Sequence, residues 1–336
     1  MAKANKEQVL SYILKLVSAG DEDLVKKTTE AFEVSKSTVY NYIKELCENG
    51  TLKKEGSSYS IVSKSSVFLY DNKDLDESRV FERDIAPLFK SLEKNVFSIW
   101  RYAFTEMMNN AIEHSSSEQI SVIVFTNPLE ASVMISDNGI GIFKNIQNYM
   151  KSEHNQELSL DECATLLFAG KFTTAKAMHS GEGIFFTSHL MDCFFVLSDD
   201  VLFSRSNFND AKVKGVKKTD STLVYMSLNN HTKKTTKEVF DRFSNVDDGF
   251  IKTQIPIAHI FPYGSPVSRS EGRRLGELIL KFKEVDLDFT GVDEVGQAFC
   301  HELFIVWQGR NPQIKLNVLN AHTDVSNMIR RVQNTK

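Results

Sequence analysis

The chain has 336 residues, of which 41% are hydrophobic and 25% are charged, enough to build two or three ordinary domains. A net charge of −4 excludes a protein that is basic over its whole surface, so any nucleic-acid contact must come from one local surface. The polar start and the lack of an apolar run near the ~20 residues that cross a bilayer predict a cytoplasmic protein without a membrane contact. Four widely spaced cysteines form no metal-binding pattern and are expected to be core thiols.

The N-terminal part of the chain predicts three helices followed by a short hairpin. The expected elements are helices over residues 5–18, 21–32 and 36–48, and strands over residues 51–54 and 59–62. Asn49-Gly50 closes the third helix as a C-cap. The apolar residues of that helix recur at helical spacing, which leaves four polar side chains outward: Ser37, Thr38, Asn41 and Lys44.

This order of elements resembles a winged helix-turn-helix, and the run VSKSTVYNYIKELCENGTLKKEGSSYSI is similar to bacterial repressor versions. The resemblance implies that residues 1–65 bind double-stranded DNA, with the third helix in the major groove. The same residues contain ten lysines, nine acidic residues and no arginine, so the strongest guanine-reading side chain is absent. DNA binding is therefore expected to need a homodimer. The alternative is a winged helix that makes only protein contacts.

Residues 66–84 are polar and charged apart from the short apolar run 67–70, and they predict a connector. Residues 85–100 predict a helix. From Phe104 to His114 apolar residues again recur at helical spacing, which places Glu106 and Asn110 on one face. A carboxylate and a carboxamide there suit a hydrated Mg²⁺ ion, because that cation takes few protein oxygens. The alternative is an ordinary solvated helix face.

Two β-rich runs, residues 118–126 and 131–136, follow and end in Asp137-Asn138-Gly139-Ile140-Gly141. An acid that leaves a strand into a glycine turn is placed to accept a hydrogen bond from an exocyclic amine. The two glycines let the backbone come close to a ligand where a Cβ would collide. A second glycine turn, residues 170–183, precedes an apolar helix over 184–191 whose first amides can hold phosphate.

Glu-x-x-x-Asn on a helix, Asp-x-Gly-x-Gly after a strand and Gly-x-Gly before a helix occur in this order, which resembles the GHKL ATPase superfamily. That superfamily contains DNA gyrase, MutL, heat-shock chaperones, histidine kinases and anti-sigma-factor kinases. The resemblance covers residues 85–230 and implies an α/β sandwich of the Bergerat type that binds ATP and Mg²⁺. It implies that Glu106 activates a water or a substrate hydroxyl, and that residues 143–180 form a mobile lid.

The remaining roles implied by the resemblance concern binding of the nucleotide and its metal. Asn110 holds Mg²⁺ and Asp137 binds the adenine amine. The residues expected to shape the pocket or contact phosphate are Gly139, Gly141, Lys171, Thr173, Thr174, His179, Ser180, Gly181 and Gly183. For His179, a solvent-exposed position on the lid is the alternative. Three further strand candidates, over 193–198, 202–204 and 222–227, would complete the sheet, with an exposed loop over 207–220.

Residues 235–248 predict a charged connector, and residues 250–336 predict an independent α/β unit. Strands are expected over 255–261, 285–289 and 314–319, and helices over 268–283, 295–307 and 325–332. The string SRSEGRRLGELILKFKEVDLDFTGVDEVGQAFCHELF resembles the STAS-like domain of unknown function found behind GHKL modules. This resemblance implies an interaction or sensing role, with a protein as partner.

The whole chain is thus expected to be a multidomain α+β and α/β protein that couples Mg²⁺-ATP binding or hydrolysis to DNA binding. One alternative is a serine/threonine kinase of the anti-sigma-factor type acting on a separate partner. The STAS-like part has no serine at residues 290–298, where the phosphoacceptor of that family would sit, and only Thr290 lies nearby. A histidine kinase is less well supported, since residues 66–104 contain no histidine. The third alternative is a binding scaffold with a slow ATPase.

Overall fold

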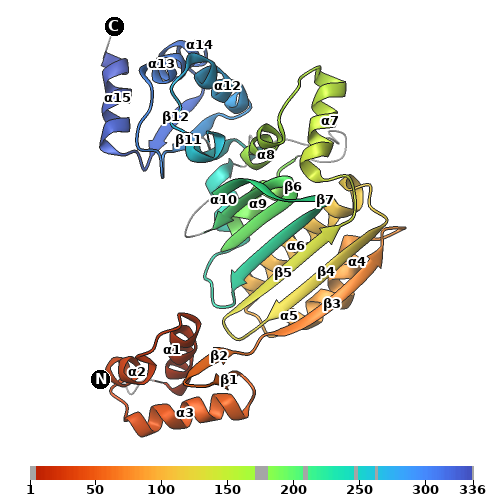
Figure 1. Ribbon diagram of the computed structural model, residues 1–336, viewed down its shortest axis with the longest axis vertical. Helices are drawn as coiled ribbons and strands as arrows, with labels where there is room; N and C mark the ends of the chain where they lie inside the picture. Colours follow the sequence, from red (N-terminus) through yellow and green to blue (C-terminus); the bar gives the residue numbers. More distant parts are fainter. Residues whose placement is uncertain (1–4, 171–180, 207–210, 246–248, 262–263, 335–336) are drawn as a thin grey trace.

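The computed structural model describes residues 5–170, 181–206, 211–245, 249–261 and 264–334. Three units follow one another along the longest axis of the molecule (Figure 1). A small helical unit lies at one end, a five-stranded sheet backed by helices forms the middle, and a second α/β unit lies at the other end. Within these residues no helix has the length and apolarity that a bilayer crossing requires.

The N-terminal unit contains three helices and a hairpin, as the sequence predicts. They are α1 (Lys6–Ser18), α2 (Leu24–Phe32), α3 (Lys36–Glu48), β1 (Leu52–Glu55) and β2 (Ser58–Ile61). Side-chain caps start two of the helices: Asn5 forms a capping box with Gln8, and the hydroxyl of Ser35 accepts a hydrogen bond from the amide of Thr38. The core of this unit also takes in Leu129, which comes from the central sheet.

The central sheet has the strand order β3-β4-β5-β7-β6, and every neighbouring pair is antiparallel. Its strands are β3 (Lys64–Asp71), β4 (Gln119–Thr126), β5 (Glu130–Asp137), β6 (Cys193–Ser206) and β7 (Ala211–Asn229). The expected connector over residues 66–84 is wrong. Residues 64–71 pair with β4 along their whole length, because Phe68 and Tyr70 alternate inward onto the core.

Residues after β3 also form regular structure where a connector was expected. They make an almost continuous helical segment, α4 (Glu77–Val80), the π-helical η1 (Phe81–Ile85) and α5 (Ala86–Phe89). The long helix α6 (Lys94–His114) follows and packs with them on one face of the sheet (Figure 1). Its buried residues include Trp100, Phe104 and Met107. The hydrophobic side chains of this interface hold α6, and therefore Glu106 and Asn110, in a fixed position beside the sheet.

The long excursion between β5 and β6 contains α7 (Ile142–His154), α8 (Leu160–Ala169) and α9 (Gly183–Leu190). Residues 143–170 of the expected lid are thus largely helical. The loop expected over residues 207–220 is wrong for residues 211–220, which belong to β7, and residues 207–210 lie outside the described part of the chain. β7 continues its hairpin pairing with β6 past a bulge near Asp199, and this pairing keeps the residues before Thr222 in the sheet.

The connector expected over residues 235–248 is also wrong for its described part. Residues 236–243 form α10 (Thr236–Phe243), which a capping box between Thr235 and Glu238 begins. Phe240 and Phe243 of α10 pack against Phe185 and Phe186 of α9. A two-stranded pair, β8 (Ser244–Asn245) and β9 (Gly249–Phe250), leads into the last unit. Helix α10 therefore joins the middle and C-terminal units through aromatic contacts.

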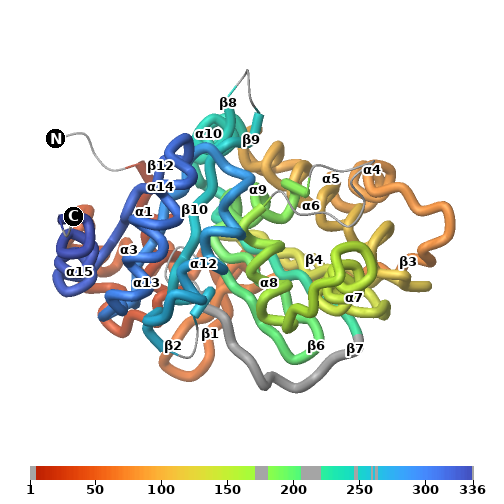
Figure 2. The backbone as a smooth tube through the Cα atoms, turned by 90° about the horizontal axis from the view of Figure 1, so that it is seen from above, coloured from red at the N-terminus to blue at the C-terminus, as the bar shows by residue number. Residues whose placement is uncertain are grey.

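The C-terminal unit has a parallel three-stranded sheet in the order β10-β11-β12, with helices on its apolar face. Its elements are β10 (Lys252–Pro256), α11 (Ile257–Ile260), α12 (Arg269–Ile279), β11 (Glu284–Asp288), α13 (Gln297–His301), η2 (Glu302–Trp307), α14 (Gln308–Arg310), β12 (Lys315–Leu319) and α15 (Thr323–Asn334). The predicted alternation is confirmed, except that β10 ends at Pro256 and residues 257–260 are helical. Figure 2, which views the molecule from above, shows the helices of this unit gathered around its strands.

Candidate functional site

Asp137 is the last residue of β5, the middle strand of the central sheet, and is buried. One of its carboxylate oxygens, Oδ1, accepts hydrogen bonds from the amides of Gly139 (2.9 Å) and Thr222 (3.4 Å). Burial raises the pKa of this carboxyl, and the two amide donors act in the opposite direction. Because both described bonds go to Oδ1, Oδ2 is the oxygen that can accept from a ligand amine.

The turn after Asp137 requires glycine at both positions, because other parts of the protein lie too close for a Cβ atom. A Cβ at Gly139 would overlap the carbonyl oxygen of Ser115, which accepts a hydrogen bond from the Ile140 amide (3.0 Å). Gly141 has φ +84°, and a Cβ there would lie 2.8 Å from Oδ2 of Asp199. The sequence predicted that the glycines admit a ligand. The close approach that excludes a Cβ is instead to the end of α6 and to β6.

Glu106 lies on α6 opposite the first turn of α9. A Cβ at Gly183, the first residue of α9, would overlap Oε2 of Glu106, so only glycine fits there while that carboxylate holds its place. A carboxylate beside a helix N-terminus is favoured by the helix dipole. Glu106 and Glu182 also act on Tyr102: burial and these two negative charges raise the pKa of the Tyr102 hydroxyl. The structure thus brings the predicted Glu-x-x-x-Asn motif of α6 into contact with the Gly-x-Gly motif at the start of α9.

Asn110 lies one helical turn beyond Glu106 on α6 and is half-buried. Its side chain therefore stands on the same helix face as Glu106, between that residue and the Ser115 end of α6 that supports the Gly139 turn. Among the described residues, no group of three or more acidic, histidine or cysteine side chains is placed to hold a metal. A metal at Asn110 would need phosphate or water oxygens for its remaining ligands, as Mg²⁺ prefers.

Five of the predicted phosphate-contacting residues lie outside the described part of the chain: Lys171, Thr173, Thr174, His179 and Ser180. The two glycines that follow them are described. Gly181 has φ +73°, a backbone conformation that favours glycine, and Gly183 opens α9. The structure therefore describes the end of the predicted glycine turn, Gly181 to Gly183, but not the residues before it.

Helix α8, within the predicted lid, is attached to the C-terminal unit. The guanidinium of Arg274 on α12 donates to Glu162 (2.8 Å), and the hydroxyl of Thr253 on β10 donates to the carbonyl of Ala169 (2.7 Å). Ala169 also belongs to the hydrophobic core of that unit, as do Phe185 and Phe186 of α9. The helices on both sides of residues 171–180 are thus anchored on the C-terminal unit.

Three residues that hold the glycine turn in place were not predicted as site residues from the sequence. The hydroxyls of Thr222 (2.9 Å) and Ser198 (3.1 Å) both accept from the amide of Ile142, which fixes the start of α7 after the glycine turn. Asp199, with φ +56°, forms the bulge in β6 beside Gly141. The sequence predicts Thr222 only as part of a strand. Its place beside Asp137 depends on pairing between β5 and β7, which are far apart in sequence.

The outward face of α3 differs in part from the prediction. Ser37, Asn41 and Lys44 are exposed, and Lys44 lies 3.6 Å from Glu48 in an ion pair. Thr38 is half-buried, because its amide and hydroxyl bond to the hydroxyl of the N-cap Ser35. Tyr40, which is 57% exposed, lies on the same face, although the sequence predicted only polar side chains there. This face offers an aromatic ring, a hydroxyl, a carboxamide and one ammonium group.

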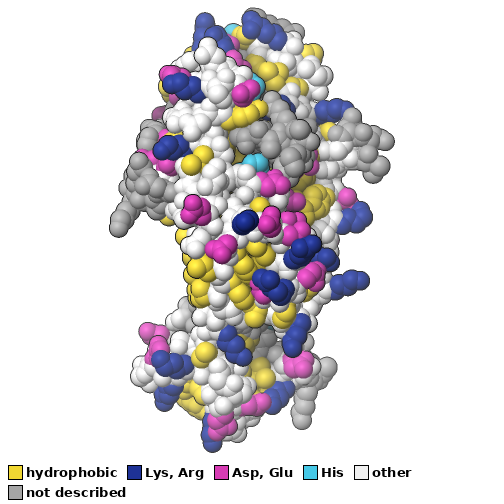
Figure 3. Space-filling model, turned by 90° about the vertical axis from the view of Figure 1, so that its right-hand side faces the viewer, with side chains coloured by type: hydrophobic (Ala, Val, Ile, Leu, Met, Phe, Trp, Pro, Cys, Tyr) yellow, Lys and Arg dark blue, Asp and Glu magenta, His cyan; other side chains and the backbone are white. Residues whose placement is uncertain are grey.

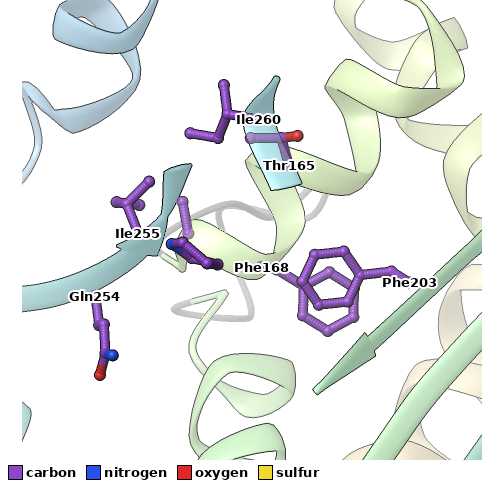
Figure 4. A pocket seen from close by; sticks show the side chains of 8 residues that line it. Thr165, Phe168, Phe203, Gln254, Ile255 and Ile260 are labelled. Carbon is purple, nitrogen blue, oxygen red and sulfur yellow. The ribbon is translucent and has the colours of Figure 1, made fainter. Parts of the chain in front are cut away.

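A shallow recess lies elsewhere, between α8 and the start of the C-terminal unit (Figure 4). The residues that line it are Thr165, Phe168, Ala169, Phe203, Gln254, Ile255, Pro256 and Ile260. The rings of Phe168 and Phe203 lie nearly parallel on one side of it. None of the predicted nucleotide-binding residues takes part, and the residues that line the recess include no basic side chain for phosphate.

Residues 271–326 match the family described as the STAS-like domain of unknown function (DUF4325). The match begins in α12 and ends in α15, so it covers most of the C-terminal unit and confirms that part of the sequence prediction. No curated protein matches the chain.

Proposed function

We propose that the chain is a Mg²⁺-dependent ATP-binding regulator of the GHKL type, in which nucleotide state controls DNA binding by the N-terminal unit. The observation that carries this proposal is the contact between Glu106 on α6 and Gly183 at the start of α9. It joins a carboxylate, suited to accept a proton, to a helix N-terminus, suited to bind phosphate. Gly139 also lies against Ser115 at the C-terminal end of α6, so this helix touches both of the other predicted motifs.

At this site each side chain has a distinct task. Oδ2 of Asp137 accepts from the adenine amine while Gly139 and Thr222 hold Oδ1 in place. The amides at the start of α9 would donate to the phosphates, and Asn110 would supply one oxygen to the metal. Bound Mg²⁺ would neutralise charge on the phosphates. Glu106 orients a water or a hydroxyl and accepts its proton.

The path from this site to the N-terminal unit runs along one strand. β5 ends at Asp137, and the turn before its first residue carries Leu129, whose side chain is buried in the core of the N-terminal unit. The amide of Leu129 is bonded to the side chain of Asn127 (2.9 Å), which fixes the turn. A strand anchored at both ends supports coupling between nucleotide state and the position of α3.

Asn110→Ala should weaken binding of Mg²⁺-ATP by roughly 10-fold or more while changing metal-free ATP affinity little, because the carboxamide contacts the metal rather than the base. Calorimetric titration with ATP in excess Mg²⁺ and in EDTA measures both values. The matched control is Asn95→Ala on the same helix, whose carboxamide bonds to the carbonyls of Thr232 and Lys234. Equal losses with and without Mg²⁺ in Asn110→Ala would exclude the metal role.

Tyr40→Ala, Asn41→Ala and Lys44→Ala should each reduce duplex DNA binding several-fold without a change in ATP affinity, since these side chains are exposed on α3 and far from its core contacts. Fluorescence anisotropy at several salt concentrations tests this, and affinity should fall steeply with salt. Lys15→Ala on α1 serves as a lysine control. DNA affinity that survives deletion of residues 1–65 would refute DNA binding by this unit.

A further inference from the structure

One face of the central sheet is left uncovered by the described helices, which pack on the other face (Figure 1). The strand register places three alternate side chains from each of the five strands on this uncovered face. They are Ser65, Val67, Leu69, Ser121, Ile123, Phe125, Ser132, Met134, Ser136, Leu223, Tyr225, Ser227, Cys193, Phe195 and Leu197. We call this set the open face.

No member of the open face carries a charge, although a quarter of the chain's residues do. Within the paired segments 64–71, 119–126, 130–137, 193–198 and 222–229, the charged residues with the same orientation stand at strand ends, Asp71 on β3 and Glu130 on β5. Val67 is 68% exposed, Leu69 66% and Phe125 37%. Hydrophobic side chains gather over the middle of the molecule in Figure 3. Large apolar side chains exposed on an uncharged sheet face favour an interaction site.

We propose that the open face is the interface of a homodimer, in which two copies pack their sheets face to face. Packed sheets lie about 10 Å apart with interdigitating side chains. Two copies of an uncharged face can meet without burying a charge, whereas a partner with an ordinary charged surface would leave charges facing apolar side chains. The alternating serines and larger apolar residues also offer both gaps and protrusions to a second copy.

The size of the open face fits a second sheet better than a single helix. Five strands spaced ~4.8 Å apart give a width of about 24 Å when each strand's own width is counted, and the three alternate residues span about 14 Å along each strand. A docked helix, about 10 Å wide, would leave the outer strands exposed.

The test compares the wild type with Val67→Lys/Leu69→Lys by sedimentation equilibrium. Both side chains are largely exposed in one copy, so lysine there preserves the fold of the monomer but places two charges in the interface. The wild type should sediment at twice the 38.1 kDa chain mass, and the double variant should dissociate at least ~100-fold more readily. Val267→Lys and Leu280→Lys, at exposed apolar positions outside the open face, should remain dimeric.

Circular dichroism and ATP affinity of each variant separate loss of association from loss of fold. If the double variant unfolds, Phe125→Lys on β4 provides a second disruption of the same face. A wild type that stays monomeric at about 100 µM, or a dimer that persists in both open-face variants, overturns the proposal. Neither result bears on the nucleotide site, because the side chains of Glu106 and Asp137 lie with the helix-covered side of the sheet.

Discussion

Asp137→Asn should lose ATP binding by roughly 100-fold or more, because the ionised carboxylate is replaced by an amide whose NH₂ group cannot accept from the adenine amine. The fold should survive, since an asparagine oxygen can still accept from the amides of Gly139 and Thr222. Calorimetry with ATP measures the loss. Asp286→Asn, at a buried aspartate of the C-terminal sheet that pairs with Lys252, is the control and should leave ATP affinity unchanged.

The same substitution should make the ligand-free protein at least as stable as the wild type at neutral pH. Burial raises the pKa of Asp137 above its ordinary 3.8, so the folded state binds a proton more tightly than the unfolded state. The free energy of unfolding of the wild type therefore falls as pH rises from 3.8 through the raised pKa, and stays lower above it. Asparagine has no such titration. Urea unfolding at pH 7 and near pH 4 should show the advantage of Asp137→Asn only at the higher pH.

If Asp137→Asn instead binds ATP with wild-type affinity, Asp137 is not the adenine contact. If Asp137→Asn neither binds ATP nor folds, its loss of binding does not test the adenine contact. Its low stability would then contradict the linkage argument, which predicts that the variant is at least as stable as the wild type at neutral pH.

Glu106→Gln should keep ATP affinity within a few-fold while turnover falls by roughly 100-fold or more. Glutamine retains the side-chain volume beside Gly183 and one acceptor oxygen but cannot take up a proton. Turnover is followed with γ-labelled ATP, which also shows whether the phosphate appears in solution or on a protein. Glu113→Gln, on the same helix, is the matched control and should turn over ATP at the wild-type rate.

The Glu106→Gln variant should also hold one DNA affinity after ATP is added, whereas the wild type should drift as ATP is consumed. Wild-type turnover in Glu106→Gln would make ATP a structural ligand and favour a binding scaffold. Transfer of label to a protein would favour the serine/threonine kinase alternative.

The sequence by itself determined the elements whose local pattern is strong. Helix α3 has its predicted bounds because Ser35 caps it and Asn49-Gly50 ends it, and the alternation of strands and helices after residue 250 follows from runs such as Val285 to Phe289. The helix that carries Glu106 and Asn110 was predicted from the 3.6-residue spacing of its buried side chains. These features depend on neighbours a few residues apart in the chain.

Only the tertiary structure decided the rest, because it depends on contacts between distant segments. Residues 64–71 are an edge strand because β4 offers a pairing partner, and the place of α10 in the fold is set by the packing of Phe240 and Phe243 on α9. Gly139 is required by the carbonyl of Ser115, and Gly183 by the carboxylate of Glu106. No local pattern reports that such atoms meet, so the reason for each glycine appears only when the helices and strands are packed together.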